Sequence, residues 1–270
     1  MSAPRPFLGL VRPLVGVVHL PPLPGAPGHA GMDAVRRRAV ADARALAAAG
    51  VDALVVENFG DAPFWKDDVP PATVAGLTAA ALAVAEAAPR LTLGVNCLRN
   101  DARAALAVAA AVGAAFVRVN VLTGAMLTDQ GVVEGRAAEI VRLRDALAPS
   151  VRIVADVLVK HAVPLAPQDV VEVARDTAER GGADALLVTG TRSARAPDDG
   201  RVRAVRAAVP RTPVLLGSGV TTANVAALLP HADGALVGSA FERGGRTGAP
   251  VDARRARAFV AAWRRARDAS

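Results

Sequence analysis

The stretch Gly50-Val51-Asp52-Ala53-Leu54-Val55-Val56 returns later in the chain as Gly182-Ala183-Asp184-Ala185-Leu186-Leu187-Val188. In both copies a glycine follows an amphipathic, alanine-containing stretch and precedes a short apolar run. Such a run is typical of a strand that is buried on both faces. The two copies indicate a repeated unit of helix, turn and strand. A half-barrel duplication and shared turn chemistry both explain the match.

The same unit repeats along the whole chain. We predict strands at 14–19, 51–57, 91–97, 115–120, 152–158, 184–189, 212–217 and 233–238. We predict helices at 33–49, 72–88, 101–112, 135–148, 168–180, 199–208, 221–229 and 252–267. Strict alternation favours a parallel sheet, and eight units in 270 residues favour its closure. The prediction is an α/β fold, a single (β/α)8 TIM barrel over 1–270 with 1–12 as an N-terminal extension. A doubly wound open sheet is the alternative, but no GxGxxG motif follows the first strand.

Glycine and aspartate mark the expected helix ends. Gly50, Gly113 and Gly181 follow helical runs, where a left-handed residue ends a helix. Asp33 and Asp101 stand where N-cap residues are expected. The longest irregular stretch, 121–134, follows the fourth strand. Its length on the catalytic face makes it a candidate lid.

Composition narrows the class of protein. The net charge is +7, but the arginines are scattered over helix surfaces and offset by acids, so we predict no nucleic-acid partner. No stretch approaches the roughly 18 apolar residues of a membrane span, and no targeting segment is visible. The single cysteine, Cys97, allows no internal disulfide and is interpreted as a buried small residue. We expect a cytoplasmic protein with no integral membrane segment. Peripheral membrane contact and homo-oligomer formation stay open.

Polar side chains collect where the predicted strands end, which is where barrels of this kind carry their chemistry. We predict catalytic roles for His19, Glu57, Asp156 and Lys160. We predict substrate binding by Asn58, Asn96, Arg118, Asn120, His161 and Thr189. Each residue taken singly has a structural alternative, such as an ion pair between Glu57 and Arg118. Together they indicate a site, because ionised groups inside a barrel cost several kcal/mol unless they are paired.

Lys160 stands out because Lys66 is the only other lysine in an arginine-rich chain. A desolvated lysine can lose its proton and act as a base or an amine nucleophile, which arginine cannot. Alternation along the fifth strand puts Lys160 on the same side as Asp156 if the strand continues that far. Lys66 lies in a polar loop and is interpreted as solvated. No HxH or HExxH spacing occurs, so no metal site is predicted, and the sequence names no cofactor.

Small residues follow the last two predicted strands. The seventh strand runs into Gly217-Ser218-Gly219, and the eighth runs into Gly238-Ser239. Such residues let the backbone approach an anion, and the N–H groups at a following helix start can donate to it. The loops after these two strands are the usual phosphate site of the fold. We therefore predict a phosphate cradle at Gly217, Ser218, Gly219, Gly238 and Ser239; the alternative is that glycine only permits tight turns.

Longer motifs resemble the BtpA/SgcQ family between about residues 13 and 262. They are 16–20 (GVVHL), 24–27 (PGAP), 56–64 (VENFGDAPF), 94–101 (GVNCLRND), 118–121 (RVNV), 128–131 (TDQG), 155–162 (ADVLVKHA) and 217–220 (GSGV). The resemblance implies a TIM-type barrel. It also implies two different functions, since a cyanobacterial member is linked to photosystem I biogenesis while relatives such as SgcQ resemble sugar-operon proteins. Residues 189–194 (TGTRSA) depart from the family pattern.

Two functions follow as alternatives. The first is an enzyme, a lyase, isomerase or hydrolase, that acts on a phosphorylated small molecule such as a sugar phosphate or nucleotide. The second is a biogenesis or assembly factor for a membrane complex of the photosystem I type, which uses the barrel as a scaffold. Converging ionisable groups at the strand ends favour the enzyme, since a scaffold has no need of them.

Overall fold

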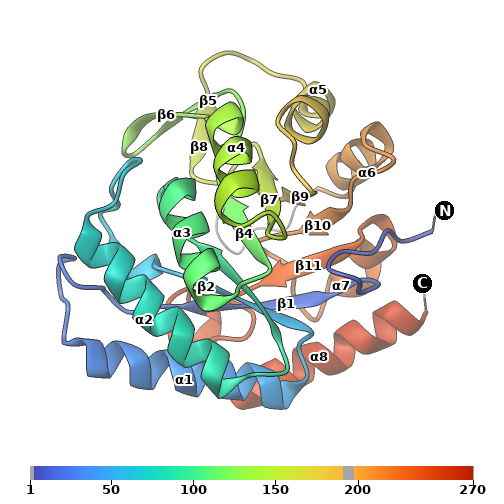
Figure 1. The fold of residues 1–270 in the computed structure, drawn as a ribbon. Coiled ribbons are helices and arrows are strands. Elements are labelled where there is room, and N and C mark those ends of the chain that lie inside the picture. Colours follow the sequence, from blue (N-terminus) through green and yellow to red (C-terminus); the bar gives the residue numbers. More distant parts are fainter. Residues whose placement is uncertain (1–2, 191–197, 270) are drawn as a thin grey trace.

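The computed structural model describes residues 3–190 and 198–269, so the departing segment from Thr191 onward lies outside the described residues (Figure 1). Eight parallel strands form a closed barrel in the order β1-β11-β10-β9-β7-β4-β3-β2. They are β1 (Leu14–His19), β2 (Ala53–Glu57), β3 (Thr92–Asn96), β4 (Phe116–Val119), β7 (Arg152–Val157), β9 (Ala185–Val188), β10 (Val214–Leu216) and β11 (Gly234–Val237). The predicted TIM barrel is confirmed, and the open-sheet alternative is excluded.

Helices surround the strands, as Figure 1 shows. They are α1 (Met32–Ala49), α2 (Pro71–Ala87), α3 (Ala102–Val112), α4 (Ala137–Leu147), α5 (Val170–Arg175), α6 (Asp199–Ala208), α7 (Val225–Leu228) and α8 (Ala253–Asp268). A π-helical turn, η2 (Asp176–Arg180), extends α5, and 3₁₀ turns are η1 (Phe59–Asp61), η3 (Leu229–His231) and η4 (Arg243–Gly245). Within the described residues, no helix has both the length and the hydropathy to cross a membrane.

Three of the predicted helix ends are confirmed. Gly50 and Gly113 are left-handed C-caps with φ of 92° and 68°. The Asp101 carboxylate accepts the backbone N–H of Ala104 and so caps α3. These positions follow from simple chemistry, because glycine tolerates a positive φ and a carboxylate satisfies an unpaired donor of the first turn.

Two of the predicted helix ends are wrong by one or two residues. Asp33 lies inside the first turn of α1, where its charge suits the helix dipole, and Gly31 takes the N-cap position. Gly181 has an ordinary φ of −79°, and the left-handed residue is Gly182 with φ of 70°. In each case a neighbouring glycine takes the backbone conformation that side chains avoid.

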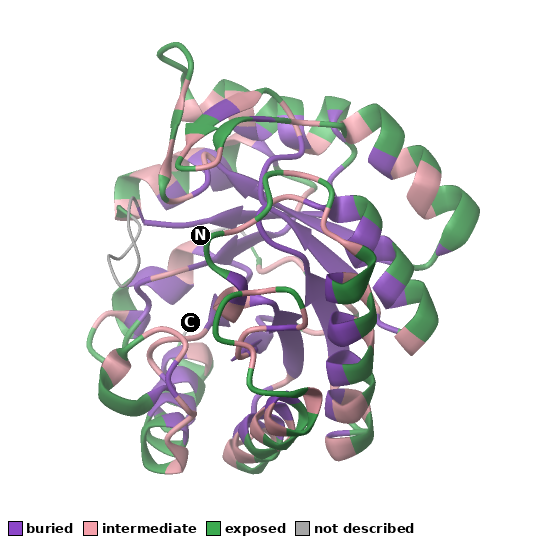
Figure 2. Ribbon diagram, turned by 90° about the vertical axis from the view of Figure 1, so that its left-hand side faces the viewer, coloured by how far each residue is buried: buried purple, intermediate pink, exposed green. Residues whose placement is uncertain are grey.

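The core has two layers, separated by the strands. Side chains that point inward fill the barrel, and those that point outward pack under the helices, whose outer faces stay exposed (Figure 2). Phe7, from the N-terminal extension, enters the inner layer and meets the ring of Phe116 edge-on, with centroids 5.7 Å apart. The extension therefore closes the N-terminal end of the barrel.

The candidate lid is a folded hairpin rather than an irregular loop. Strands β5 (Ala125–Thr128) and β6 (Gly131–Glu134) pair antiparallel, and β8 (Ala162–Pro164) adds to β5. One face of this small sheet packs Met126 and Val133 into a satellite core. The expectation of an irregular stretch at 121–134 is wrong, because the hairpin is short and its third strand comes from a distant segment. Its role as a lid stays a prediction.

Candidate functional site

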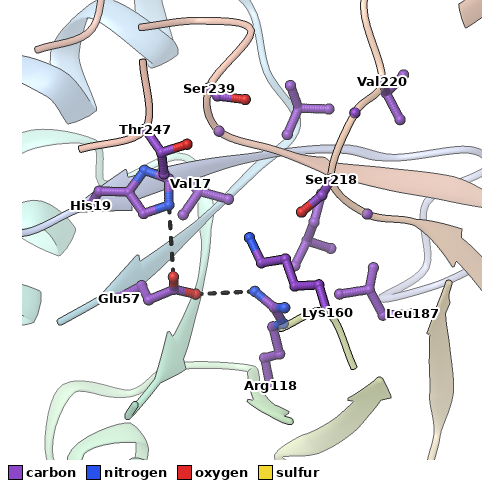
Figure 3. Close-up of a pocket in the computed structure, with 15 residues that line it drawn as sticks. Val17, His19, Glu57, Arg118, Lys160, Leu187, Ser218, Val220, Ser239 and Thr247 are labelled. Carbon is purple, nitrogen blue, oxygen red and sulfur yellow. Dashed lines mark hydrogen bonds and ion pairs between the residues drawn. The ribbon is translucent and has the colours of Figure 1, made fainter. Parts of the chain in front are cut away.

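An open pocket lies at the C-terminal ends of the barrel strands and encloses about 510 Å³, solvent at its entrance included. Its charged or ionisable lining side chains are His19, Glu57, Arg118 and Lys160. Its opposite wall is formed by both small-residue loops, Gly217, Ser218, Gly219, Gly238 and Ser239, with Thr247 beside them. Figure 3 shows Lys160 and Glu57 pointing into the same space. Residues from seven parts of the chain thus meet where the fold predicts a site.

Arg118 is the buried centre of the ionic network. Its Nε and Nη2 donate to the two Asp156 carboxylate oxygens at 2.9 and 2.8 Å, a bidentate pair. Its Nη1 donates to Glu57 at 3.1 Å. Burial alone would lower the pKa of Arg118, but the two carboxylates raise it, so the guanidinium stays charged. Both oxygens of Asp156 bind Arg118 and hold the guanidinium in place, and the catalytic role of Asp156 stays a prediction.

Glu57 joins the arginine to the histidine. Its Oε2 accepts the side-chain amide of Asn96 at 2.6 Å, and its Oε1 lies 3.7 Å from Nε2 of His19. Burial acts to raise the pKa of Glu57, but Arg118, His19 and Lys160 together hold it below its ordinary value. Glu57 is therefore a carboxylate at neutral pH, surrounded by positive or protonatable groups.

His19 is held from the other side by a residue that the sequence analysis did not single out. Its Nδ1 lies 2.7 Å from Oε1 of Glu242, which is buried and also accepts the backbone N–H of Gly248 at 3.2–3.3 Å. The His19 ring packs against Phe59 with centroids 4.8 Å apart. A carboxylate on one ring nitrogen fixes the orientation of the imidazole and leaves the other nitrogen directed towards Glu57 and the pocket.

Lys160 reaches the pocket by a route that the sequence analysis did not foresee. Strand β7 ends at Val157, so alternation does not extend to Lys160. The chain turns through Leu158 and His161, which both have positive φ, and Arg99 donates to the Lys160 carbonyl at 2.8 Å. The pKa of the Lys160 amine is lowered, first by burial and then by Arg118, while Glu57 and Asp156 oppose that effect.

The glycines of the predicted cradle have local reasons to be glycine. A Cβ on Gly217 would lie 2.5 Å from Cγ2 of Thr189, and one on Gly238 would lie 2.6 Å from Cε1 of His19. Gly219 has a φ of 88°. The predicted helix at 221–229 is only the short α7, which begins at Val225, so its start does not follow the glycine loop directly. An anion site at these loops is therefore supported by the pocket and its charged lining residues rather than by a helix start.

The other predicted residues divide into two groups. Asn96, Asn120 and Thr189 are buried at the strand ends, and the described residues give no partner to Asn96 Oδ1, Asn120 Oδ1 or Thr189 Oγ1. None of these three side chains lines the pocket, and Asn58 and His161 do not line it either. Asn58 braces the rim, since it donates to Asp61 at 2.9 Å and accepts the Leu98 N–H at 2.6 Å.

Two further groups bear on the chemistry. Cys97 is buried, and burial, followed by Asp101 and Asp61, raises the pKa of its thiol well above the ordinary value. A thiol of this kind is a poor nucleophile.

Over the described parts of the chain, no three His, Cys, Asp or Glu side chains are grouped so as to hold a metal ion. Thr247, in the loop before α8, adds a hydroxyl to the pocket that the sequence analysis missed.

Solved structures share the architecture. Phosphoribosyl anthranilate isomerase from Thermus thermophilus superposes with a TM-score of 0.58 at 16% identity, covering 93% of this chain and 98% of that one. A structure titled "Native KDPGal structure" gives 0.58 at 18% identity, covering 95% and 96%. At these identities the likeness supports the fold alone.

Sequence relatives are far closer. The photosystem I biogenesis protein BtpA of Synechocystis is 45% identical over 255 residues, which cover 93% of this chain and 88% of that protein. An uncharacterised protein of Pyrococcus horikoshii is 45% identical over 237 residues, or 87% and 90% of the two chains. The family model described as "BtpA family" matches residues 10–265, nearly the whole barrel. The chain therefore belongs to the BtpA family.

Proposed function

We propose that the protein is an enzyme that acts on a phosphorylated small molecule, such as a sugar phosphate or a nucleotide. The observation that carries the proposal is the pocket itself, since one cavity joins both small-residue loops to Lys160, Glu57 and His19. A ligand whose phosphate lies at the loops has its remaining atoms against these ionisable groups. The name of the isomerase with the same architecture shows that a phosphoribosyl substrate is compatible with this fold.

The phosphate end is formed by Gly217, Ser218 and Gly219 on one loop and by Gly238 and Ser239 on the other. Gly217 donates its N–H to the Val188 carbonyl at 2.8 Å, so the backbone donors for an anion come from the other residues of the two loops. The serine hydroxyls add donors. Arg118 of the same pocket supplies positive charge. An anion held there gains charge-assisted hydrogen bonds, which are stronger than neutral ones.

The reacting end is formed by Lys160, His19 and Glu57. The lowered pKa of the buried Lys160 amine favours a neutral base or nucleophile. His19, which Glu242 orients, is a second proton carrier, and Glu57 stabilises positive charge on either. Arg118, fixed by Asp156, orients the substrate with Asn96, Asn120 and Thr189. Direct ligand contacts by Asn58 and His161 stay predictions. The set serves lyase, isomerase and hydrolase chemistry equally.

A crystal soaked in phosphate tests the binding half of this proposal. We expect an anion between the Gly219 and Ser239 loops, with Lys160 facing it. An anion bound elsewhere with this site empty contradicts the proposal. Incubation with a panel of sugar phosphates and nucleotides, followed by mass spectrometry, then tests for turnover.

A biogenesis or assembly factor is the second candidate. The named Synechocystis relative favours it, together with an exposed apolar row on the small sheet. Leu127 pairs with Val132 on one strand and with Val163 on the other. Cross-strand partners lie on the same face of a sheet, and all three side chains are exposed, so they form one apolar row. If this row binds a partner, Leu127→Lys abolishes that binding and leaves turnover unchanged. If the protein is an enzyme alone, the same variant changes neither.

A further inference from the structure

A second pocket adjoins the first across the small-residue loops. It encloses about 770 Å³, open solvent included. It shares Gly219, Val220 and Ser239 with the first pocket, so the same short loops form a wall of both. The rest of its lining is Thr221, Thr222, Ala240, Gly245, Arg255, Ala258 and Phe259. The phosphate cradle therefore lies between the two pockets, and a ligand bound at the cradle has the second pocket beside it.

Arg255 supplies the charge of this second pocket. It lies in the first turn of α8, and its Nε donates to the carbonyl of Ala240 at 3.2 Å. Ala240 directly follows Ser239, so the guanidinium is anchored one residue from the cradle. The described residues give its two terminal nitrogens no hydrogen-bond acceptor, while the neighbouring Asp252 carboxylate accepts the backbone N–H groups of Arg254 and Arg255. A guanidinium held at one nitrogen presents the other two to an anion.

We propose that the second pocket binds a second phosphate of the same ligand, so that the substrate class is a diphosphate, with its first phosphate at the cradle and its second at Arg255. The inference rests on the proposed function, since it places the first phosphate in the mouth pocket. The hydroxyls of Thr221 and Thr222 line the same space and add donors. A monophosphate ester would occupy only the first pocket and would make no contact with Arg255.

Calorimetric titration with inorganic phosphate and with pyrophosphate distinguishes the two ligand classes. The probes share their chemistry and differ in the second phosphate group. One additional charge-assisted contact predicts that pyrophosphate binds about tenfold more tightly than phosphate. Arg255→Gln should remove most of that gain and leave the affinity for phosphate unchanged. Arg254→Gln is the matched control, since Arg254 is its exposed neighbour on α8 and does not line the pocket.

A second pair of variants tests the space rather than the charge. Ala258 is exposed on α8 and lines the second pocket, whereas Ala261 is exposed on the same helix and does not. Ala258→Trp should weaken pyrophosphate binding and spare phosphate, while Ala261→Trp should change neither. Both substitutions are at exposed positions, so the variants are expected to fold.

The outcomes separate this inference from the proposed function. A preference for pyrophosphate that Arg255→Gln and Ala258→Trp both reduce supports the diphosphate class. Equal binding of the two probes, or a preference that both variants retain, overturns the inference and leaves the phosphate site of the first pocket standing. Failure of both probes to bind the wild-type protein overturns the inference and the phosphate half of the proposed function together.

Discussion

The barrel buries an ionic cluster at each of its two ends, and the two clusters differ in what surrounds them. At the N-terminal end Asp233 is fully buried between Arg5 and Arg206. At the C-terminal end Arg118 is buried between Asp156 and Glu57. Burial and pairing are alike, so neither property by itself marks a functional site.

At the N-terminal end the Asp233 carboxylate is fully paired. The two oxygens of Asp233 accept the backbone N–H groups of Arg5 and Val214, at 2.9 Å each, and the guanidinium groups of Arg5 and Arg206, at 3.0 and 2.9 Å. Phe7 fills the barrel interior from the same extension. This cluster ties the first residues of the chain to strands β10 and β11, and all four hydrogen bonds that Asp233 accepts come from this chain.

The C-terminal cluster borders a cavity. Arg118 and Glu57 line it, and the Lys160 amine with its lowered pKa enters it. Three buried polar atoms nearby, on Asn96, Asn120 and Thr189, have no partner among the described residues. Arg12 Nε at the N-terminal end is also a buried atom without a hydrogen-bond partner among the described residues. Unpaired atoms therefore do not separate the two clusters, and the distinguishing property is the open pocket that Arg118 and Glu57 line.

The largest effect is expected at the N-terminal end. Asp233→Asn removes the charge that compensates Arg5 and Arg206, and breaking a buried ion pair in this way costs about 3–5 kcal/mol of stability. Urea unfolding measures the loss. Phosphate affinity of the folded fraction should not change. A large loss of affinity in this variant would show that the two ends are coupled and would break the comparison.

Lys160→Arg, at the C-terminal end, should lower turnover and leave stability unchanged. It keeps the charge but cannot usefully give up a proton, so a base or nucleophile at 160 predicts a fall in turnover of about 10²-fold or more. Phosphate binding and unfolding midpoint should stay near those of the wild type. Retained activity would make Lys160 an electrostatic clamp.

The pH profile of the wild type adds a second measurement for Lys160. A base acts only after it loses its proton, so turnover should rise with pH up to the pKa of the amine. Because burial lowers that pKa below 10.5, the rise should be complete at a lower pH than for an exposed lysine. A profile that falls over this range would contradict a base at 160.

A smaller effect, on phosphate affinity, is expected when glycine is replaced by aspartate at the C-terminal end of the barrel and, as a control, at the N-terminal end. Gly219 and Gly113 both have positive φ, so aspartate strains the backbone at either position. Only Gly219→Asp adds a negative charge to the phosphate cradle, and we expect it to weaken phosphate binding about tenfold, or ~1.4 kcal/mol. Gly113→Asp, at the helix C-cap before β4, should cost stability alone. Equal phosphate affinity in the two variants would argue against the cradle.

Most of the fold follows from the sequence because local patterns determine it. Each barrel strand is a short apolar run between helical stretches, and the strand bounds agree to within two residues. The pocket residues follow from the rule that parallel strands end at one face. The rarity of lysine points to Lys160, and the residue does line the pocket. The expected strand alternation out to residue 160 is wrong, because β7 ends at Val157.

The missed features are long-range contacts. His19 and Glu242 are 223 positions apart, and Arg5 and Asp233 are 228 apart, so no local pattern pairs them. The hairpin β5–β6 needs β8, which comes almost 30 positions later, after β7. Its turn, Thr128-Asp129-Gln130-Gly131, does carry a local signal in the glycine with φ of 92°. A search for turn residues inside the long segment would have found the hairpin.

Acid titration gives the smallest and most specific contrast. The pKa of Glu57 is lowered in the folded protein, because the attraction of Arg118, His19 and Lys160 exceeds the opposing effect of burial. Such a group contributes stability that is present above its unfolded pKa, about 4.3, and that is lost as the pH falls through the lower, folded pKa. The glutamine side chain of Glu57→Gln cannot titrate, so this variant should lose less stability between about pH 7 and pH 3 than the wild type does.

Glu172→Gln, at an exposed ion pair with Arg175, is the control and should follow the wild type, because solvent screens that charge. If Glu57→Gln and the wild type unfold in parallel over this range, Glu57 is not held as a carboxylate by its neighbours. The pocket would then carry one more uncompensated positive charge than the geometry indicates, and Glu57 would be no different from a neutral hydrogen-bonding residue at the same position.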